Sequence, residues 1–436
     1  MNSDTVALSE FCTVRKGLSY KGEYIHQQGP ALLGIGTIKE GGGFRPENVR
    51  TYGGPYKEEH VLNPGDVYVA LTSQDGFLIG SPAMVPKDFE GFGITTHHDA
   101  KIDWKTDNLI MRDFLYWAMH SFQFIRHCQN FSVGTTVYAT LGKDVERFVV
   151  PRNLTPKQIL ATTTLNTISA EIDNICKTRE NLETKIETLF RSWFIDFDPV
   201  KYRANGKLPH GMSKETAMLF PDSFEDSDLG LIPSGWKCGQ LGDCLSIIES
   251  GKRPKGGAEQ ISEGVPSIGA ESINGVGNFE MSNLKLISHD FFSQMKKGIV
   301  ENGDVMLYKD GAHVGRVAMF DRDYPFTKCA INEHVFRLRT NHHLTQHYLY
   351  CLMSNPQLRW HLECRAIKAA QPGLNKKDLA SIPIVMPPLE IVKKFTESVK
   401  LLFDYIFEGA KVNQQYANVR DALIPRLITG ESEVRH

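Results

Sequence analysis

The stretch Thr155–Phe194 reads TPKQILATTTLNTISAEIDNICKTRENLETKIETLFRSWF, and it decides how the chain is organised. Thr155 suits a helix N-cap, Pro156 suits the first helical position, and Gln158 completes a capping box. Apolar residues then recur at alternating steps of four and three, which is the seam of a coiled coil. The seam consists of Ala161, Leu165, Ile168, Ile172, Ile175, Leu182, Ile186, Leu189 and Trp193, with a polar break at Arg179. The pattern predicts one helix of roughly 40 residues and about 60 Å, packed along its length against another helix.

A second copy of the same plan lies 235 residues further along the chain (310 − 75). Asp75-Gly76-x-x-Ile79-Gly80 matches Asp310-Gly311-x-x-Val314-Gly315, and Gly65-Asp66-Val67 matches Gly303-Asp304-Val305 with a slip of three residues. Other matched pairs are Leu8 and Leu241, Gly17 and Gly251, Ile38 and Ile273, Phe44 and Phe279, Tyr116 and Tyr350, and Asp144 and Asp378. Because the pairs are colinear, we interpret the chain as an internal duplication.

The duplication supplies the partner that the first helix needs. Its seam maps onto Phe395, Val399, Leu402, Ile406, Gly409, Asn413, Tyr416, Arg420, Leu423 and Leu427. The polar break is shared, because Arg179 aligns with Asn413. A module and a linker separate the two helices, so an antiparallel coiled coil is the predicted pairing.

The modules that precede the long helices read as mixed α+β structure. Short β-branched runs such as 67–71, 147–150 and 382–385 predict strands, and Gly- and Pro-rich turns separate them. Residues 113–126 and 345–364 predict one helix in each module, without the regular alternation of a doubly wound fold. The predicted boundaries are 1–154 for the first module, 155–198 for the central helix, 199–235 for a linker, 236–388 for the second module and 389–430 for the C-terminal helix.

Bulk properties exclude several classes of protein. The 436 residues are 41% hydrophobic and 23% charged with a net charge of −2, which is ordinary for a globular protein of two or three domains. The start of the chain has no secretory pattern and no apolar run has transmembrane length, so a cytoplasmic protein is expected. The eight cysteines form no C-x-x-C pair, which predicts reduced thiols and no zinc site.

Two segments carry a resemblance to a known family. Leu189–Val200 ends the central helix, and it is followed by Leu219–Phe224 and by Leu229-Gly230-x-Ile232-Pro233-x-Gly235-Trp236. Near the C-terminus, Gly373–Leu379 leads to Met386–Leu389, and the helix closes with Leu423–Gly430. In this succession the chain closely resembles the specificity (S) subunit of Type I restriction–modification enzymes. The first module departs modestly, because it ends in a single-proline Val150-Pro151.

The resemblance implies a function without catalysis. In that family the modules are target recognition domains that each read one half of a split, asymmetric site in double-stranded DNA, and the paired helices set the gap. Two methyltransferase subunits dock on the helices and methylate adenine N6 with S-adenosylmethionine. Restriction subunits use ATP and Mg for translocation and cleavage, so no cofactor is expected in this chain. The alternative is a duplicated scaffold that binds protein without reading DNA.

Candidate DNA contacts fall in matched turns of the two modules. Phosphate or base contact is predicted for basic, amide and hydroxyl side chains beside these turns. In the first module they are Thr72, Ser73, Gln74, Thr135, Thr136 and Tyr138; in the second they are Lys252, Arg253, Lys255, Lys309, His313, Arg316, Lys368, Gln371 and Asn375. The competing interpretation is ordinary solvated loops that vary between copies.

Motifs for catalysis are missing or weak. There is no G-x-x-x-x-G-K-[ST] phosphate loop, and Asp198-Pro199-Val200 lacks the second proline and aromatic residue of an amino-methyltransferase loop. Glu183 and Lys185 are expected to be a charge pair on the solvated side of the coil. His97-His98 and the group His342, His343 and His347 have metal-like spacing, but we expect loop or helix-surface histidines because no cysteine or carboxylate set accompanies them.

Overall fold

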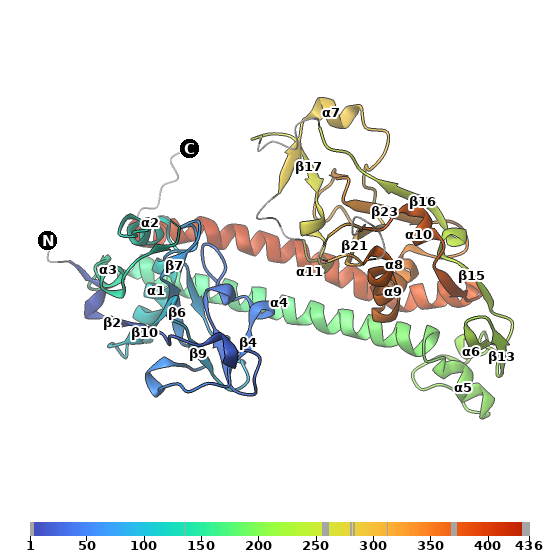
Figure 1. Cartoon of the computed structure of the whole chain (residues 1–436), viewed down its shortest axis with the longest axis horizontal. Helices are drawn as coiled ribbons and strands as arrows, with labels where there is room; N and C mark the ends of the chain where they lie inside the picture. The colour runs from blue at the N-terminus through green and yellow to red at the C-terminus, as the bar shows by residue number, and fades with distance from the viewer. Residues whose placement is uncertain are drawn as a thin grey trace. The chain divides into compact units, whose positions relative to one another are not determined.

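The computed structural model describes residues 4–134, 136–254, 261–279, 281, 284–311, 313–367 and 373–429. The chain divides into two compact units (Figure 1). Unit 1 comprises residues 1–172 and 416–436, and unit 2 comprises residues 173–415. Both long helices contribute residues to each unit, so unit 2 is an insertion within unit 1 along the chain.

Unit 1 is built on two small sheets. A four-stranded sheet has the order β2-β10-β6-β8, and a second has the order β4-β3-β9-β5. The pairs β1-β12 and β7-β11 complete the unit. The strands are β1 (Thr5–Ala7), β2 (Cys12–Lys16), β3 (Ala31–Leu33), β4 (Arg50–Thr51), β5 (Val61–Leu62), β6 (Val67–Ala70), β7 (Thr72–Ser73), β8 (Pro82–Met84), β9 (Gly93–Thr95), β10 (Asp99–Trp104), β11 (Tyr138–Ala139) and β12 (Val149–Pro151). The helices are α1 (Leu109–Met119), α2 (Phe122–Asn130) and α3 (Gly142–Glu146).

Unit 2 repeats this plan with additions. Its main sheet has the order β16-β23-β20-β21-β18, a second has the order β19-β17-β22, and β15-β24 and β13-β14 are paired. The strands are β13 (Phe224–Ser227), β14 (Gly230–Pro233), β15 (Lys237–Gln240), β16 (Leu245–Ser250), β17 (Val265–Ile268), β18 (Gly275–Val276), β19 (Lys285–Ile287), β20 (Asp304–Tyr308), β21 (Val317–Phe320), β22 (Ala330–Ile331), β23 (Val335–Thr340) and β24 (Pro383–Met386). The helices are α5 (Asp198–Ala204), α6 (Lys214–Ala217), α7 (His289–Ser293), α8 (Gln346–Ser354), α9 (Pro356–Ile367) and α10 (Lys376–Ala380).

The internal duplication is confirmed by strand order and by register. The strands β2-β10-β6-β8 correspond in order to β16-β23-β20-β21. The predicted match of Ile38 and Phe44 with Ile273 and Phe279 recurs as an antiparallel bridge between the two residues in each unit. The mixed helix-and-sheet class predicted from sequence is therefore correct.

The three-residue slip lies in one hairpin loop. In unit 1, Ala70 N donates to Ser81 O and Gly80 N donates to Ala70 O. In unit 2, Tyr308 N donates to Arg316 O and Gly315 N donates to Tyr308 O. The same two hydrogen bonds thus close loops of different length, and the extra residues in unit 1 are 72–74. The first two of them form β7, which pairs with β11.

The long helices are α4 (Pro156–Phe194) and α11 (Leu389–Thr429). The predicted capping box is present, because Thr155 N donates to Gln158 Oε1 and Gln158 N donates to Thr155 Oγ1. In the described structure every predicted seam residue of α4 is buried or half-buried. The helix pattern therefore predicted both the start and the buried face of α4.

The two helices pair in opposite directions within each unit. In unit 1, Gln158 Nε2 donates to Leu427 O, and Leu165 shares a core with Ile424. In unit 2, Asn413 Nδ2 donates to Cys176 Sγ, and the rings of Phe190 and Phe395 lie 5.7 Å apart. Partner numbers fall along α11 as they rise along α4, which is the predicted antiparallel pairing.

Several local predictions were wrong. The single helix predicted over 113–126 is two helices, because the Ser121 side chain caps a new one by accepting from Phe124 N. The helix predicted over 345–364 is likewise divided into α8 and α9. Arg147 caps the end of α3 and is not part of a strand. The segment 199–235, predicted as an ordered or semi-ordered linker, is indeed ordered: it holds most of α5, all of α6 and the β13-β14 hairpin, and Phe220 within it is buried in the core of unit 2.

Candidate nucleic-acid interface

In each unit, four neighbouring strands of the main sheet begin or end along the same side of that sheet. In unit 2, Ser250 at the end of β16 pairs with Phe336 at the start of β23. Tyr308 at the end of β20 pairs with Val335, and Leu307 pairs with Val317 at the start of β21. The loops that follow or precede these strands therefore leave the sheet at the same edge, which we call the reading edge. In unit 1 the equivalent ends belong to β2, β10, β6 and β8.

A chain of polar and ionisable side chains crosses the reading edge of unit 2. Arg253 Nε lies 3.0 Å from Glu333 Oε1, and Glu333 Oε1 lies 3.4 Å from His334 Nε2. The other ring nitrogen of His334, Nδ1, lies 3.3 Å from Asp310 Oδ2. Lys309 pairs with the same carboxylate of Asp310. The structure thus brings together Arg253 and Lys309, which the sequence placed in separate turns.

Backbone contacts hold the loops of this edge in place. Leu374 N donates to Lys309 O over 2.8 Å, and Asp310 forms a bridge with Gly373. Asn375 is exposed, and its side chain caps α10 by accepting from Asp378 N over 2.9 Å. The predicted contact residue Asn375 therefore has a capping role, which leaves its amide donor bound to Asp378.

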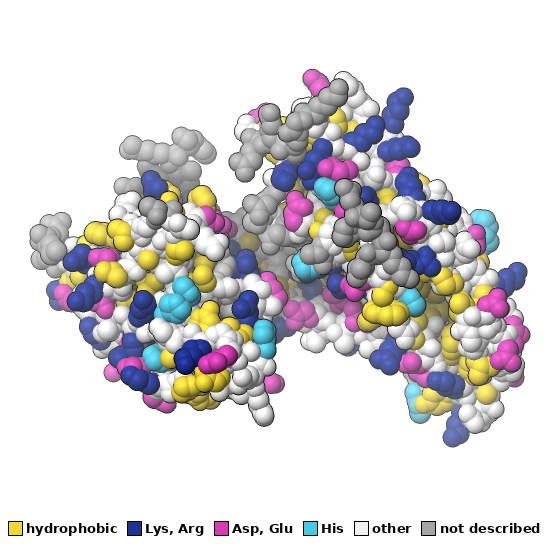
Figure 2. Space-filling model, in the orientation of Figure 1, with side chains coloured by type: hydrophobic (Ala, Val, Ile, Leu, Met, Phe, Trp, Pro, Cys, Tyr) yellow, Lys and Arg dark blue, Asp and Glu magenta, His cyan; other side chains and the backbone are white. Residues whose placement is uncertain are grey.

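The other predicted basic contact residues of unit 2 that the structure describes differ in exposure. Lys252 and His313 are exposed, and the His313 ring packs edge-on against Tyr308 with centroids 6.4 Å apart. Arg316 is half-buried, and its backbone closes the hairpin loop. Figure 2 shows Lys and Arg side chains gathered over the part of unit 2 that carries β17 and α7. A surface of this kind attracts phosphate and positions a duplex without reading its sequence.

At the reading edge of unit 1, several of the predicted contact residues carry hydroxyl and amide groups. Thr72 Oγ1 lies 3.0 Å from His98 Nδ1, and Tyr138 pairs with Ser73 in the β7-β11 ladder. Gln74 and Thr136 are exposed at this edge. Amide and hydroxyl groups can both donate to and accept from the edges of bases.

Ser73 shapes its turn. Its side chain is buried, donates to Asp75 Oδ1 over 2.5 Å and accepts from Gly76 N over 3.1 Å. Because both functions of the hydroxyl are used within the turn, Ser73 contributes through the shape of the loop. Four other predicted contacts lie outside the described residues: Thr135, Lys255, Lys368 and Gln371.

Sequence reasoning missed Glu333, His334 and His98 as members of the edges. In the sheet register His98 lies at the position of His334, because Leu71 N donates to His98 O and Lys309 N donates to His334 O, so the repeat carried a signal for that pair. The spacing of His97 and His98 resembles that of metal ligands, and it does not predict a place at this edge. His97 and His98 lie in the turn between β9 and β10 and are half-buried, as expected for loop histidines. In the described part of the chain no group of His, Cys, Asp and Glu has the geometry of a metal site.

Asp99 anchors the loop that carries His97 and His98. Its side chain is fully buried and accepts from the hydroxyls of Thr95 and Thr96. Burial raises the pKa of Asp99 to about 7, and the two threonine hydrogen bonds oppose this shift. The loop between β9 and β10 therefore rests on a carboxyl group that titrates near neutral pH.

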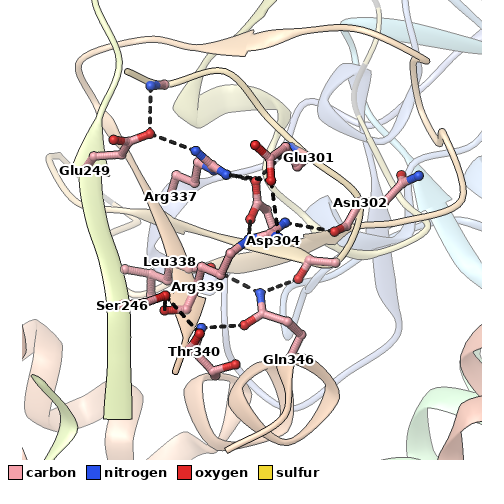
Figure 3. Close-up of polar contacts among 12 residues, drawn as sticks. Ser246, Glu249, Glu301, Asn302, Asp304, Arg337, Leu338, Arg339, Thr340 and Gln346 are labelled. Carbon is pink, nitrogen blue, oxygen red and sulfur yellow. Dashed lines mark hydrogen bonds and ion pairs between the residues drawn. The ribbon is translucent and has the colours of Figure 1, made fainter. Parts of the chain in front are cut away.

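An ion network ties together the strands behind the reading edge of unit 2 (Figure 3). Arg337 Nε lies 2.5 Å from Asp304 Oδ2 and Arg337 Nη1 lies 2.9 Å from Glu249 Oε1. Arg339 Nε lies 2.8 Å from Asp304 Oδ1. The network links β16, β20 and β23. Because Asp304 and Arg337 are buried, separating their charges would cost a large free energy.

Glu183 corrects one prediction about the coil. It does not face solvent: it is half-buried and accepts a hydrogen bond from Tyr350 Oη over 3.0 Å. Burial raises the pKa of the Glu183 carboxyl, and the Tyr350 hydrogen bond opposes the shift. Glu183 therefore attaches α4 to α8 and is not a member of a surface pair with Lys185.

The helices and cysteines of the described residues fit an ordinary globular chain. No helix among them combines the length and the apolar character needed to cross a membrane. All eight cysteines are free. Burial raises the pKa of Cys12 to about 12, so this thiol stays protonated and is a poor nucleophile.

Comparison with known proteins shows similarity to specificity subunits of Type I restriction enzymes. Residues 233–409 match the model of the Type I restriction modification DNA specificity domain. The chain is 24% identical over 334 residues to the Type I restriction enzyme MjaIX specificity subunit of Methanocaldococcus jannaschii, covering 74% of this chain and 70% of that protein. It is 25% identical over 294 residues to the HindI specificity subunit of Haemophilus influenzae, covering 58% of this chain and 62% of that protein.

A solved structure supports the fold. The S subunit of a Type I restriction–modification system from M. genitalium superposes with a TM-score of 0.56 at 13% identity, covering 98% of this chain and 97% of that one. Residues 233–409 therefore match a Type I restriction modification DNA specificity domain, and the chain is similar to Type I restriction enzyme specificity subunits.

Proposed function

We propose that each unit reads one half of a split, asymmetric DNA site. The observation that carries this proposal is the repeated reading edge: one framework occurs twice, and its loops bear different side chains. Two readers of different sequences need this combination, because the framework fixes the approach to the duplex while the loop residues meet the bases.

We further propose that α4 and α11 set the distance between the two half-sites. Each is one continuous helix that contributes to both units. A helix of 39 residues is roughly 60 Å long, and its paired seam resists bending. A pair of helices of this kind acts as a ruler only if the units stay fixed to it. Polar contacts such as Trp117 Nε1 to Asn166 Oδ1, at 2.7 Å in unit 1, support that attachment.

The same helices are the proposed docking surface for methyltransferase subunits. Leu401, Tyr405, Val412 and Val419 are exposed on α11. At 3.6 residues per turn they lie within about 40° of one another, on a face beside the seam. An exposed apolar stripe at this spacing suits a helix from a partner. In the proposed complex the partner methyltransferases bind S-adenosylmethionine and methylate adenine N6, and restriction subunits bind ATP and Mg.

One experiment tests these proposals together. The chain is expressed with its methyltransferase partner in a host without other adenine methylation, and long-read sequencing maps the methylated sites. We expect a single motif of two defined halves separated by a fixed undefined gap. The chain alone should transfer no methyl group from S-adenosylmethionine. Methylation without any motif would favour the scaffold alternative, in which the units bind protein without reading DNA.

A further inference from the structure

We propose that Arg253 reads a guanine in the half-site bound by unit 2, and that Glu333 is its positioning residue. This inference rests on the proposed function, and it adds the identity of a base and of the side chain that selects it. It starts from the way in which Arg253 is held.

The guanidinium of Arg253 is anchored at one nitrogen only. Its Nε lies 3.0 Å from Glu333 Oε1, and 31% of the side chain is exposed. Among the described residues neither terminal nitrogen of Arg253 has a hydrogen-bond partner. Those two nitrogens carry four N–H donors in one plane. Guanine presents two acceptors, O6 and N7, side by side in the major groove, and a free arginine fork matches them.

The anchor is itself fixed by the backbone. Gly251 N donates to Asn332 O over 3.1 Å, so the loop of Arg253 is attached to the loop of Glu333. The approach requires glycine, because a Cβ on Gly251 would lie 1.6 Å from Ile331 O. His334 N donates to Asn332 Oδ1 over 2.9 Å, which holds the second loop in turn. Arg253 is therefore oriented before DNA arrives, and less entropy is lost on binding.

Further contacts restrict the Glu333 carboxylate. Its Oε1 also faces His334 Nε2 at 3.4 Å, and His334 Nδ1 faces Asp310 at 3.3 Å. Its Oε2 is buried. The Glu333 side chain is 41% exposed, and these contacts to its carboxylate favour one direction for the fork of Arg253. This geometry distinguishes Arg253 from the exposed neighbour Lys252, whose charge can meet a phosphate from many positions.

Unit 1 lacks this arrangement. Gly17 matches Gly251 in the repeat, so Ser19 matches Arg253. His98 matches His334, because Leu71 N donates to His98 O and Lys309 N donates to His334 O, so His97 matches Glu333. His98 Nδ1 instead lies 3.0 Å from the hydroxyl of Thr72. The guanine contact is therefore specific to one half of the site, which makes the halves chemically different.

The test is selection of bound sequences from a randomised DNA duplex library by the full chain in complex with its methyltransferase partner. The native complex should enrich a split motif with a guanine in one half. Arg253→Lys removes the fork and keeps the charge, so preference for that guanine should fall about tenfold to a hundredfold with all other positions unchanged. Arg253→Gln should change the preference from guanine to adenine, because an amide pairs with adenine N6 and N7. Glu333→Gln should weaken selection at the same position only.

Lys252→Ala is the matched control. It should lower affinity for all sequences evenly and reduce the dependence of affinity on salt. Arg253 is not a base reader if Arg253→Lys and Arg253→Gln leave every position unchanged, or if they behave as Lys252→Ala does. If the native complex enriches no motif at all, the proposed function fails, and this inference fails with it. Thermal unfolding of each variant shows that the chain is folded.

Discussion

At the scale of single residues, the reading edge of unit 1 depends on a buried carboxyl group. Asp99 is held by two threonine hydroxyls, and burial raises its pKa to about 7. In the unfolded chain an aspartate titrates near pH 3.9. The folded state therefore retains the Asp99 proton over a pH range in which the unfolded state has lost it.

The sign of the pH effect follows from that difference. The stability that protonated Asp99 contributes is full below about pH 4 and is lost as pH rises through 7, with a slope of up to about 1.4 kcal/mol per pH unit. Asp99→Asn should remove this slope, and urea unfolding at several pH values measures it. Asp103→Asn on the same strand is the control and should keep the slope. Equal slopes for Asp99→Asn and the native chain would contradict the assignment.

The ion network of unit 2 gives a second prediction at this scale. Asp304 is fully buried between Arg337 and Arg339 (Figure 3). Asp304→Asn leaves two guanidinium groups without their main counter-charge and should lower the free energy of unfolding by about 3–5 kcal/mol. Glu301→Gln is the control, because the Glu301 side chain is 60% exposed and its loss should cost less than about 1 kcal/mol. Chemical denaturation compares the two, and equal costs would count against a network role for Asp304.

Sequence patterns located the loops of the interface but not the contacts within them. Arg253 was identified in a basic turn, whereas Glu333 was not identified because its role depends on a partner eighty positions away. Glu183 was misplaced for a related reason. A helix pattern predicts the face that meets the other helix, but it does not show that a module such as α8 covers a second face.

At the scale of elements, the proposal that α4 and α11 set the distance between the half-sites can be tested by lengthening both helices. The division between the units falls between Ile172 and Asp173 in α4 and between Gln415 and Tyr416 in α11. Inserting seven residues at both points keeps the seam in phase, because seven is the heptad period. It lengthens each helix by about 10 Å, so the gap between the methylated halves should grow by about three base pairs.

Mapping of methylated sites measures that gap. Insertion into α4 alone is the control, because it puts the seams out of register and should lower stability without defining a longer gap. An unchanged gap in the double insertion, with methylation retained, would show that the helices do not set the spacing.

Element boundaries show what the sequence could and could not predict. The start of α4 was predictable because Thr155 and Gln158 form a local capping box. The division at Ser121 was also signalled locally by a capping residue, but a continuous apolar pattern concealed it. The segment 199–235 resisted prediction because its many Gly and Pro residues suggest a linker, whereas burial of Phe220 depends on tertiary packing.

At the scale of the whole molecule, the units should be separable by mutation. Gln74 is exposed in the longer loop of unit 1, and the corresponding loop of unit 2 lacks those three residues. Gln74→Ala should relax one position in one half-site by about tenfold or more, since an amide contact to adenine is lost. The other half-site should be unchanged.

Methylome sequencing measures both halves in one experiment. Lys214→Ala on α6 is the control and should alter neither half. Relaxation of both halves by Gln74→Ala would mean that the units do not read independently.

The nesting of unit 2 within unit 1 has a consequence for synthesis on the ribosome. Leu165 and Ile168 emerge early, but Ile424 and Leu427, which share the core of unit 1 with Leu165, emerge about 260 residues later. At typical translation rates that interval lasts tens of seconds. Unit 2 can complete its core first, while the nascent first helix still shows an uncovered apolar stripe. Chaperones or an early partner subunit would then bind unit 1. Unit 1 is the last unit to complete its core, although most of its sequence is synthesised first.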